Sequence, residues 1–199
     1  MSLRIIIPVK PFAEAKQRLS PALNPSARAS LAEELFRHVL ATAMVVARAG
    51  EVIVVSRGPE VLLLAEQSGA TGLAESLDAD LNAALSQAAE IARAQGAAKL
   101  LIVASDLPLL CESDLAALIA ETCAVAPDRH GRGTNALLWP ATPMIGFCFG
   151  DNSFAHHRAA AKAAGLDPQI ILRPGLAHDV DLPSDLFDLP FDASVPRRR

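Results

Sequence analysis

Two aspartates occupy matching sequence contexts, each followed by Leu-Pro. Asp106 lies in SDLPLL, directly after the apolar run KLLIVAS, and Asp181 lies in DVDLPSDL. Both follow segments that read as strands, so their carboxylates are expected at the carboxyl edge of one sheet. Two carboxylates from separate strand ends can hold one Mg²⁺ and leave positions for water and phosphate oxygens. We therefore predict Asp106 and Asp181 as magnesium ligands, with Asp179 an open alternative to Asp181. A turn or cap is the competing interpretation of a lone Asp, and we expect Asp185 to cap the last helical turn.

Three cations follow the first apolar run, in the segment IPVKPFAEAKQRL. Lys10, Lys16 and Arg18 suit a triphosphate, whose charge they would share with a metal ion. The segment is not a P-loop, because it lacks the GxxxxGK[ST] pattern. We predict that all three bind the nucleotide and that Lys16 also takes part in catalysis. A solvated loop is the competing interpretation, and exposed charges at Lys16 and Arg18 would contribute little to stability.

A polar run with two glycines, APDRHGRGTNALL at 126–138, precedes an apolar segment. It is either a plain surface turn or a loop that binds a phosphate or a carboxylate. Arg129 and Arg132 could add charge to such a pocket, or they could face solvent. The segment FGDNSF follows closely, and its Ser153 opens a helix whose N-terminus favours an anion.

The elements that must position these residues alternate along the chain. Short β-branched runs predict buried strands, and segments with helical spacing lie between them. This alternation predicts an α/β fold, a Rossmann-like, mixed and mostly parallel sheet covered on both faces. We expect a single domain over residues 1–190 and a solvated tail over 191–199. The expected strands are 3–9, 51–56, 99–105, 122–126, 135–139, 145–149 and 169–172; the expected helices are 25–49, 59–68, 78–95, 112–120 and 153–164, with a helical turn at 183–186.

Composition excludes several functional classes. The chain has 199 residues, 51% of them hydrophobic, and a net charge of −4, so no basic field would attract nucleic acid. No apolar run approaches the roughly 18 residues of a membrane helix, and the short apolar N-terminus does not resemble a signal peptide. We expect a cytoplasmic protein with three reduced cysteines. Helices rich in Ala and Leu leave room for a homodimer.

Taken together and in this order, IPVKPFAEAKQRLS, SDLPLL, APDRHGRGTNALL, FGDNSFAHH and DVDLPSDL resemble the guanylyltransferases of coenzyme F420 biosynthesis. The resemblance covers roughly residues 3–187. It implies a GT-A-like nucleotidyltransferase fold and transfer of GMP from GTP to a small phosphorylated acid: 2-phospho-L-lactate, phosphoenolpyruvate or 3-phospho-D-glycerate. Carried over by motif, Thr134, Gly150 and Ser153 would contact the acid, and Asn82 would lie near the nucleotide, a helix cap being its alternative role. His157 fits the family pattern only loosely.

The implied chemistry needs no general base. An ionised phosphate oxygen of the acceptor would attack the α-phosphorus of GTP, and pyrophosphate would leave. Such a reaction needs charge cancellation and alignment of two anions, which Mg²⁺ on Asp106 and Asp181 would provide. The alternatives are another nucleotidyltransferase of the same fold, such as a molybdenum-cofactor guanylyltransferase, or a nucleotide-binding protein without turnover. The alternative nucleotidyltransferases lack support, because many of them have a glycine-rich loop of the LAGGxSxRxG type after the first strand and this chain has none.

Overall fold

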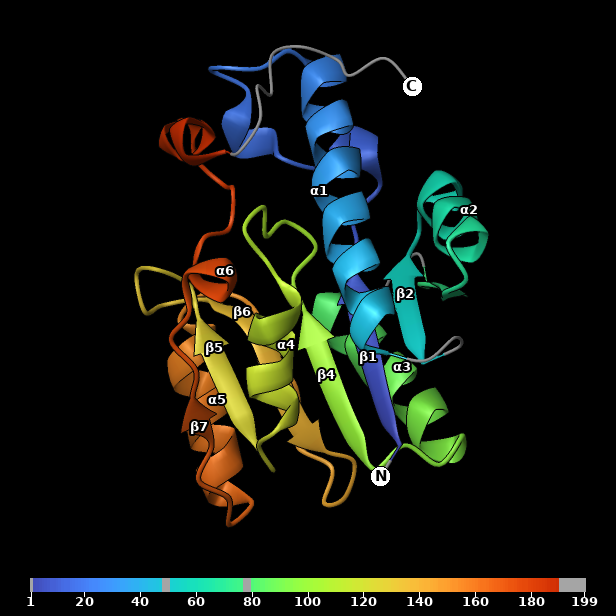
Figure 1. The fold of residues 1–199 in the computed structure, drawn as a ribbon, viewed down its shortest axis with the longest axis vertical. Coiled ribbons are helices and arrows are strands. Elements are labelled where there is room, and N and C mark those ends of the chain that lie inside the picture. The colour runs from blue at the N-terminus through green and yellow to red at the C-terminus, as the bar shows by residue number, and fades with distance from the viewer. Residues whose placement is uncertain (1, 48–50, 77–79, 190–199) are drawn as a thin grey trace.

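Within the described part of the chain, one sheet of seven strands organises the fold (Figure 1). The computed structural model describes residues 2–47, 51–76 and 80–189. The strands lie in the order β3 (Thr71–Ala74), β2 (Val52–Ser56), β1 (Leu3–Pro8), β4 (Lys99–Val103), β6 (Thr134–Pro140), β5 (Ala124–Pro127) and β7 (Gln169–Ile170). Strand β6 runs antiparallel to its neighbours β4 and β5, and the other pairs are parallel. The predicted mixed, mostly parallel sheet is therefore confirmed.

Helices cover both faces of the sheet. The helices α1 (Pro25–Val46), α2 (Pro59–Gln67) and α4 (Glu112–Ile119) pack on one face, and α3 (Leu81–Ala94) and α5 (Ser153–Ala163) pack on the other. Successive strand residues point to opposite faces. Ile5 and Ile7 accordingly belong to the first core cluster, while Ile6 between them belongs to the second. Burial on both faces explains why the central strands are almost uniformly apolar.

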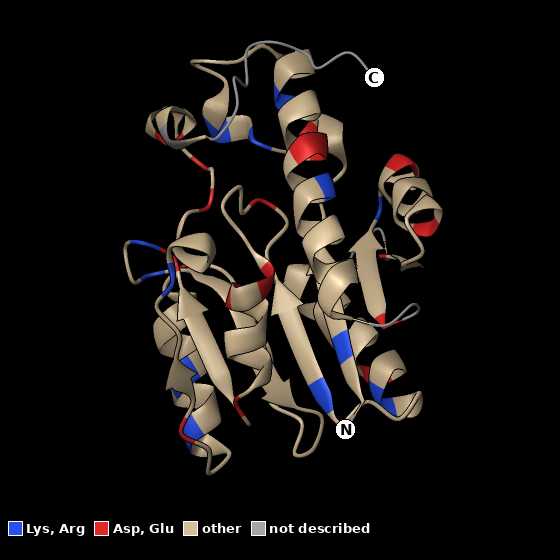
Figure 2. Ribbon diagram, viewed as in Figure 1, with Lys and Arg blue, Asp and Glu red and all other residues tan. Residues whose placement is uncertain are grey.

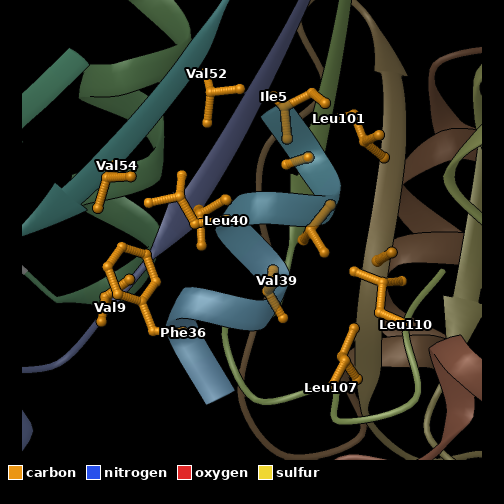
Figure 3. Packing of buried hydrophobic residues seen from close by; sticks show 14 of the residues in the cluster. Ile5, Val9, Phe36, Val39, Leu40, Val52, Val54, Leu101, Leu107 and Leu110 are labelled. Atoms are coloured by element: carbon orange, nitrogen blue, oxygen red, sulfur yellow. The ribbon is translucent and has the colours of Figure 1, made fainter. Parts of the chain in front are cut away.

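Helix α1 supplies most of the helical side of the first core cluster. Its Phe36, Val39 and Leu40 are at most 2% exposed and contact residues of β1, β2 and β4 (Figure 3). The helix begins with Pro25 at its first position, and the Asn24 side chain accepts a 2.9 Å hydrogen bond from the Ala27 N–H. A capping Asn and a proline at the first helical position both favour a helix start there.

Short helical segments complete the chain. The 3₁₀ turns η1 (Phe12–Glu14) and η2 (Gln17–Leu19) follow β1, and α6 (Pro174–Ala177) and η3 (Pro183–Asp188) follow β7. None of the helices within the described ranges is long and apolar enough to cross a membrane. The expected tail at 191–199 lies outside the described residues.

The predicted strand at 145–149 is wrong. No strand forms there, because side chains take up the hydrogen bonds of this backbone. His157 accepts from Cys148 N–H, and the Asn82 amide bonds to both the N–H and the carbonyl of Phe149. Strand β3 was not among the expected strands; it is a partly exposed edge strand of four residues that contains Gly72. A glycine in a short strand weakens the pattern that predicts strands.

Candidate functional site

Polar segments converge at the end of the sheet where its parallel strands terminate, the upper end of the strands in Figure 1. Strand β6 begins at this end because it runs antiparallel to β4. In Figure 2, the loop after β4 and the segment before η3 carry acidic residues here, and the η1–η2 segment carries basic ones. The carboxyl edge is where open α/β sheets bind ligands.

Lys16 joins the two aspartates that the sequence singled out. Its ammonium pairs with Asp106 and lies 3.3 Å from Asp181 Oδ1. The Lys16 side chain is only 8% exposed, so the expectation of an exposed charge is wrong for this residue. Burial alone would lower the pKa of Lys16, but the charges of Asp106 and Asp181 outweigh it and raise that pKa. Lys16 is therefore a charged group held between two carboxylates.

Apolar neighbours hold each of these charged side chains in place. Leu107 and Leu110, on either side of Pro108, are buried in the first core cluster and fix the loop that carries Asp106 (Figure 3). Leu19 and Val180 are both buried in a third cluster with residues of α1. That cluster joins the Lys16 loop to the Asp181 segment, so buried apolar side chains next to Lys16 and Asp181 hold the ion-paired residues in position.

Asp179 lies within the same group of charges. Burial first, and then the charge of Asp106, raise the pKa of Asp179, while a hydrogen bond from Asn135 opposes the rise. The Asn135 amide donates to Asp179 Oδ1 at 3.1 Å and to the Leu176 carbonyl at 3.0 Å. We call Lys16, Asp106, Asp179 and Asp181 the charged cluster.

Asp185 shapes the backbone next to Asp181. Its carboxylate accepts from the N–H groups of Asp181 at 2.8 Å and Leu182 at 2.7 Å, and it pairs with Arg129. Burial by itself would raise the pKa of Asp185, but these hydrogen bonds and the Arg129 charge lower it. Asp185 closes the first turn of η3, in agreement with the capping role expected from the sequence.

The charged cluster suits a cation. A lysine ammonium already lies between Asp106 and Asp181, so the two carboxylates can share one positive charge. No group of three or more His, Cys, Asp or Glu side chains in the described chain is arranged to hold a metal ion. Magnesium commonly takes only one or two carboxylates and completes its shell with water and substrate phosphates. The donor set therefore fits Mg²⁺ held jointly with a nucleotide.

The other two cations of the segment differ from Lys16. Arg18 lies 3.4 Å from Asp181 Oδ2, but its side chain is 72% exposed. Lys10 is exposed directly after the buried Val9. The assignment of both residues to the nucleotide stays a prediction.

A second group of polar residues surrounds His157, on α5. Thr134 Oγ1 lies 3.0 Å from His157 Nδ1, and His157 Nε2 accepts from Cys148 N–H at 2.9 Å. Thr134, Ser153 and His157 are 7%, 2% and 0% exposed, respectively. We call these three residues the hydroxyl cluster. It lies on the α5 side of β6, and Asn135, the next residue along β6, points to the α6 side.

Gly150 and Ser153 begin the turn into α5. The N–H of Ser153 bonds to the Gly150 carbonyl at 3.2 Å, and Gly150 has φ +130°, a conformation that favours glycine. A Cβ built on Gly150 meets no atom within 4 Å, so the space beside it is open. Asn152 rather than Ser153 occupies the cap position of α5. The structure thus brings Thr134, Gly150 and Ser153 together, and their role toward an acceptor stays a prediction.

Asn82 does not cap α3, because Asp80 occupies that position. Its amide accepts from Phe149 N–H at 2.8 Å and donates to the Phe149 carbonyl at 3.0 Å. Both polar ends of the side chain therefore hold the segment before Gly150. Its predicted nearness to the nucleotide remains untested.

The carboxylate of Asp128 closes the glycine-bearing loop before β6 by hydrogen bonds to the loop's own backbone. Asp128 accepts from the N–H groups of His130 at 3.0 Å, Arg132 at 2.9 Å and Gly133 at 2.9 Å. These backbone donors already bind a carboxylate within the loop, so the loop does not offer them to a ligand. Its contribution to the site is to deliver Thr134 and Asn135 at the start of β6.

The sequence did not point to Asn135 or Asp128 as joining residues. Arg129 was expected either to add charge to the pocket or to face solvent, and in the structure it pairs with Asp185. The partners of these residues lie far along the chain or within the loop, and no pattern of spacing signals them. Asn135 stands beside Thr134 in the quoted motif, and an amide side chain at the start of the expected strand 135–139 was the available clue.

The chain is similar to proteins of known classification. Residues 3–194 match the family model described as "Guanylyl transferase CofC like". A phosphoenolpyruvate guanylyltransferase from Sphaerobacter thermophilus is 38% identical, covering 98% of this chain and 96% of that protein. One of the same name from Rubrobacter xylanophilus is 39% identical, covering 100% of both.

Solved structures share the fold at low sequence identity. A putative nucleotide-diphospho-sugar transferase from Desulfovibrio desulfuricans aligns with a TM-score of 0.71 at 17% identity, covering 91% of this chain and 83% of the other. A nucleotidyl transferase from Methanothermobacter aligns at 0.61 and 16%, covering 94% and 95%. These likenesses confirm the predicted nucleotidyltransferase-like fold.

Proposed function

The chain belongs to the family of CofC-like guanylyl transferases, and from this premise we propose that it transfers GMP from GTP to phosphoenolpyruvate. The bond between the α- and β-phosphates of GTP breaks, a bond forms between the α-phosphorus and a phosphate oxygen of the acceptor, and pyrophosphate leaves. The reaction would belong to coenzyme F420 biosynthesis, as the family resemblance implies. 3-Phospho-D-glycerate and 2-phospho-L-lactate are the competing acceptors.

The observation that carries the proposal is the junction at Thr134 and Asn135. Thr134 belongs to the hydroxyl cluster, and the next residue, Asn135, bonds to Asp179 of the charged cluster. The main chain strengthens this junction, because Ala104 N–H, two residues before Asp106, bonds to the Asn135 carbonyl at 2.8 Å. One cluster suits a metal-bound triphosphate and the other suits an acid anion, so two anionic substrates would lie side by side.

The chain's own residues would act mainly by charge and alignment. Asp106 and Asp181 would hold Mg²⁺, which when bound neutralises charge on the phosphates of the nucleotide. Lys16 and Arg18 would bind the β- and γ-phosphates and stabilise the charge of the departing pyrophosphate. Thr134 and Ser153 would donate hydrogen bonds to the acceptor anion near Gly150. The attacking phosphate oxygen is already ionised, so no side chain has to remove a proton.

The relatives support phosphoenolpyruvate as the first acceptor to test, because both of those described above carry that acceptor in their names. The test incubates the purified chain with GTP, Mg²⁺ and each of the three acids separately. Pyrophosphate release and the mass of the nucleotide product are followed together. We expect a guanylylated acid and an equal amount of pyrophosphate, fastest with phosphoenolpyruvate.

Two controls separate the alternatives. ATP or CTP in place of GTP tests the nucleotide, and Asp106→Asn tests whether turnover arises from this site. Nucleotide binding without pyrophosphate release in the presence of any of the three acids would indicate a binding protein and would contradict the proposal.

A further inference from the structure

His157 touches every segment of the predicted acceptor site. It lies one turn after Ser153 on α5, contacts Thr134 at the start of β6, and accepts from Cys148 N–H two residues before Gly150. The rings of Phe149 and Trp139 meet its imidazole edge-on, with centroid distances of 4.6 Å and 6.1 Å. With no exposed surface, the ring has little freedom to turn.

The hydrogen bonds determine which nitrogen of His157 carries the proton. A backbone N–H can only donate, so the bond from Cys148 requires Nε2 to be the unprotonated acceptor. A neutral imidazole then carries its hydrogen on Nδ1, and Nδ1 must donate to Thr134 Oγ1. Burial, with a smaller contribution from His156, lowers the pKa of His157 to about 4, so the ring is neutral at pH 7.

This tautomer decides what Thr134 presents to a ligand. Because Oγ1 already accepts a hydrogen from His157, its own hydroxyl hydrogen is free to point elsewhere. No second partner of Thr134 Oγ1 occurs in the described parts of the chain. Phosphate and carboxylate oxygens of a phosphorylated acid only accept hydrogen bonds at neutral pH. With the opposite tautomer the hydroxyl would donate to His157 and turn its lone pairs toward the anion.

We propose that His157 is a positioning residue that makes Thr134 a hydrogen-bond donor to the anionic acceptor. The proposal rests on the proposed function for the identity of the acceptor, a phosphorylated carboxylic acid. It adds a residue that holds the Cys148–Gly150 segment and orients the Thr134 hydroxyl at the same time. Asn82 supports the same segment through Phe149 but does not reach Thr134 in any recorded contact.

The first test reads the tautomer directly. Long-range ¹H–¹⁵N correlation spectra of protein labelled with ¹⁵N-histidine distinguish protonated from bare ring nitrogens. We expect His157 at pH 7 to show a protonated Nδ1 and an unprotonated Nε2. His157→Asn identifies the signals by their loss, and His156→Asn, which alters the exposed neighbour, serves as the matched control. A protonated Nε2 or a charged ring would overturn the proposal.

The second test separates the two hydrogen bonds of the ring. In His157→Asn the short amide can take the place of Nδ1 and still donate to Thr134. In His157→Gln the longer amide can reach toward Cys148 but leaves Thr134 without its donor. We expect the KM for phosphoenolpyruvate to rise about 10-fold in the Gln variant and about 3-fold or less in the Asn variant, with the KM for GTP nearly unchanged in both.

A merely structural role would give a different pattern. It would change the KM values for acceptor and GTP together, or weaken both variants equally, and either result would overturn the proposal. Binding of phosphoenolpyruvate without GTP, measured by calorimetry, keeps the test independent of turnover. If no product forms but the Gln variant still weakens this binding, the proposed function fails and the role of His157 stands. If product forms and neither variant changes acceptor binding or KM, the role of His157 fails and the function stands.

Discussion

Asn135 Nδ2 lies 3.1 Å from Asp179 Oδ1, and this bond ties the start of β6 to the segment that carries Asp181. Thr134, the preceding residue, points to the opposite side of the strand and bonds to His157. The two neighbours therefore connect the charged cluster with the hydroxyl cluster through a single peptide unit. A rigid link of this kind would hold two anionic substrates in fixed alignment.

The Asn135–Asp179 link can be measured by a double-mutant cycle. We predict that Asn135→Ala lowers the free energy of unfolding by about 1–3 kcal/mol, because it leaves the partly buried Asp179 carboxylate and the Leu176 carbonyl without their donor. Asp179→Ala combined with it should cost less than the sum of the two single changes, by at least about 0.5 kcal/mol. Chemical denaturation of the four proteins provides the measurement, and strictly additive losses would show that the bond contributes nothing.

Removal of the carboxylates in the charged cluster should abolish turnover. We predict that Asp106→Ala and Asp181→Ala each lower kcat by at least about 100-fold, because each removes a proposed ligand of the ion that stabilises the transition state. Calorimetric titration with Mg²⁺ in the presence of GTP should show weaker metal binding for both. Near-normal kcat in either variant would remove that carboxylate from the proposed metal site.

Asp185→Ala should behave differently from these two changes. Asp185 is only 4% exposed and bonds to Asp181 N–H, Leu182 N–H and Arg129. We expect a loss of about 1–3 kcal/mol in the free energy of unfolding and a fall in kcat smaller than that of Asp181→Ala. Unaltered stability would show that these hydrogen bonds do not hold the segment.

Substitutions of Lys16 and Arg18 should differ in their effects on thermal stability and on catalysis. Lys16→Met leaves Asp106 and Asp181 close together without their shared cation, so it should lower both kcat and the melting temperature at pH 7. Arg18→Ala removes a 72% exposed charge and should raise the KM for GTP with an unchanged melting temperature. Equal thermal stability of the two variants would show that the Lys16 ion pairs contribute nothing to the fold.

His157 should give the protein an acid-sensitive stability. Its pKa is about 4 in the folded protein, against 6.5 for an ordinary histidine, so the unfolded chain binds more protons between these values. The resulting contribution is fully present above pH 6.5 and falls by about 2–3 kcal/mol as the pH approaches 4.5. The test is chemical denaturation at pH 7 and pH 4.5. The fall in the free energy of unfolding between these pH values should be about 2–3 kcal/mol smaller in His157→Asn than in wild type. His156→Asn should retain most of the wild-type pH dependence, because burial is the larger cause of the lowered pKa of His157. An unchanged slope in His157→Asn would contradict the assignment.

The fold was largely predictable because apolar runs and helical spacing report burial directly. The exception at 145–149 is instructive, since IGFCF has the composition of a strand but its backbone bonds to His157 and Asn82. Such long-range side-chain partners leave no local pattern. The same reason hid Asn135, and it hid the burial of Lys16, which depends on Asp106 and Asp181 from distant segments.

The central claim is that an acceptor phosphate oxygen attacks the α-phosphorus of GTP at this site. Phosphoenolpyruvate labelled with ¹⁸O on every non-bridging phosphate oxygen tests it directly, with products resolved by mass spectrometry. The account predicts that the guanylylated acid retains all of the label and that pyrophosphate contains none. Labelled oxygen in a phosphate released from the acid, or a product without GMP joined to the labelled phosphate, would contradict it.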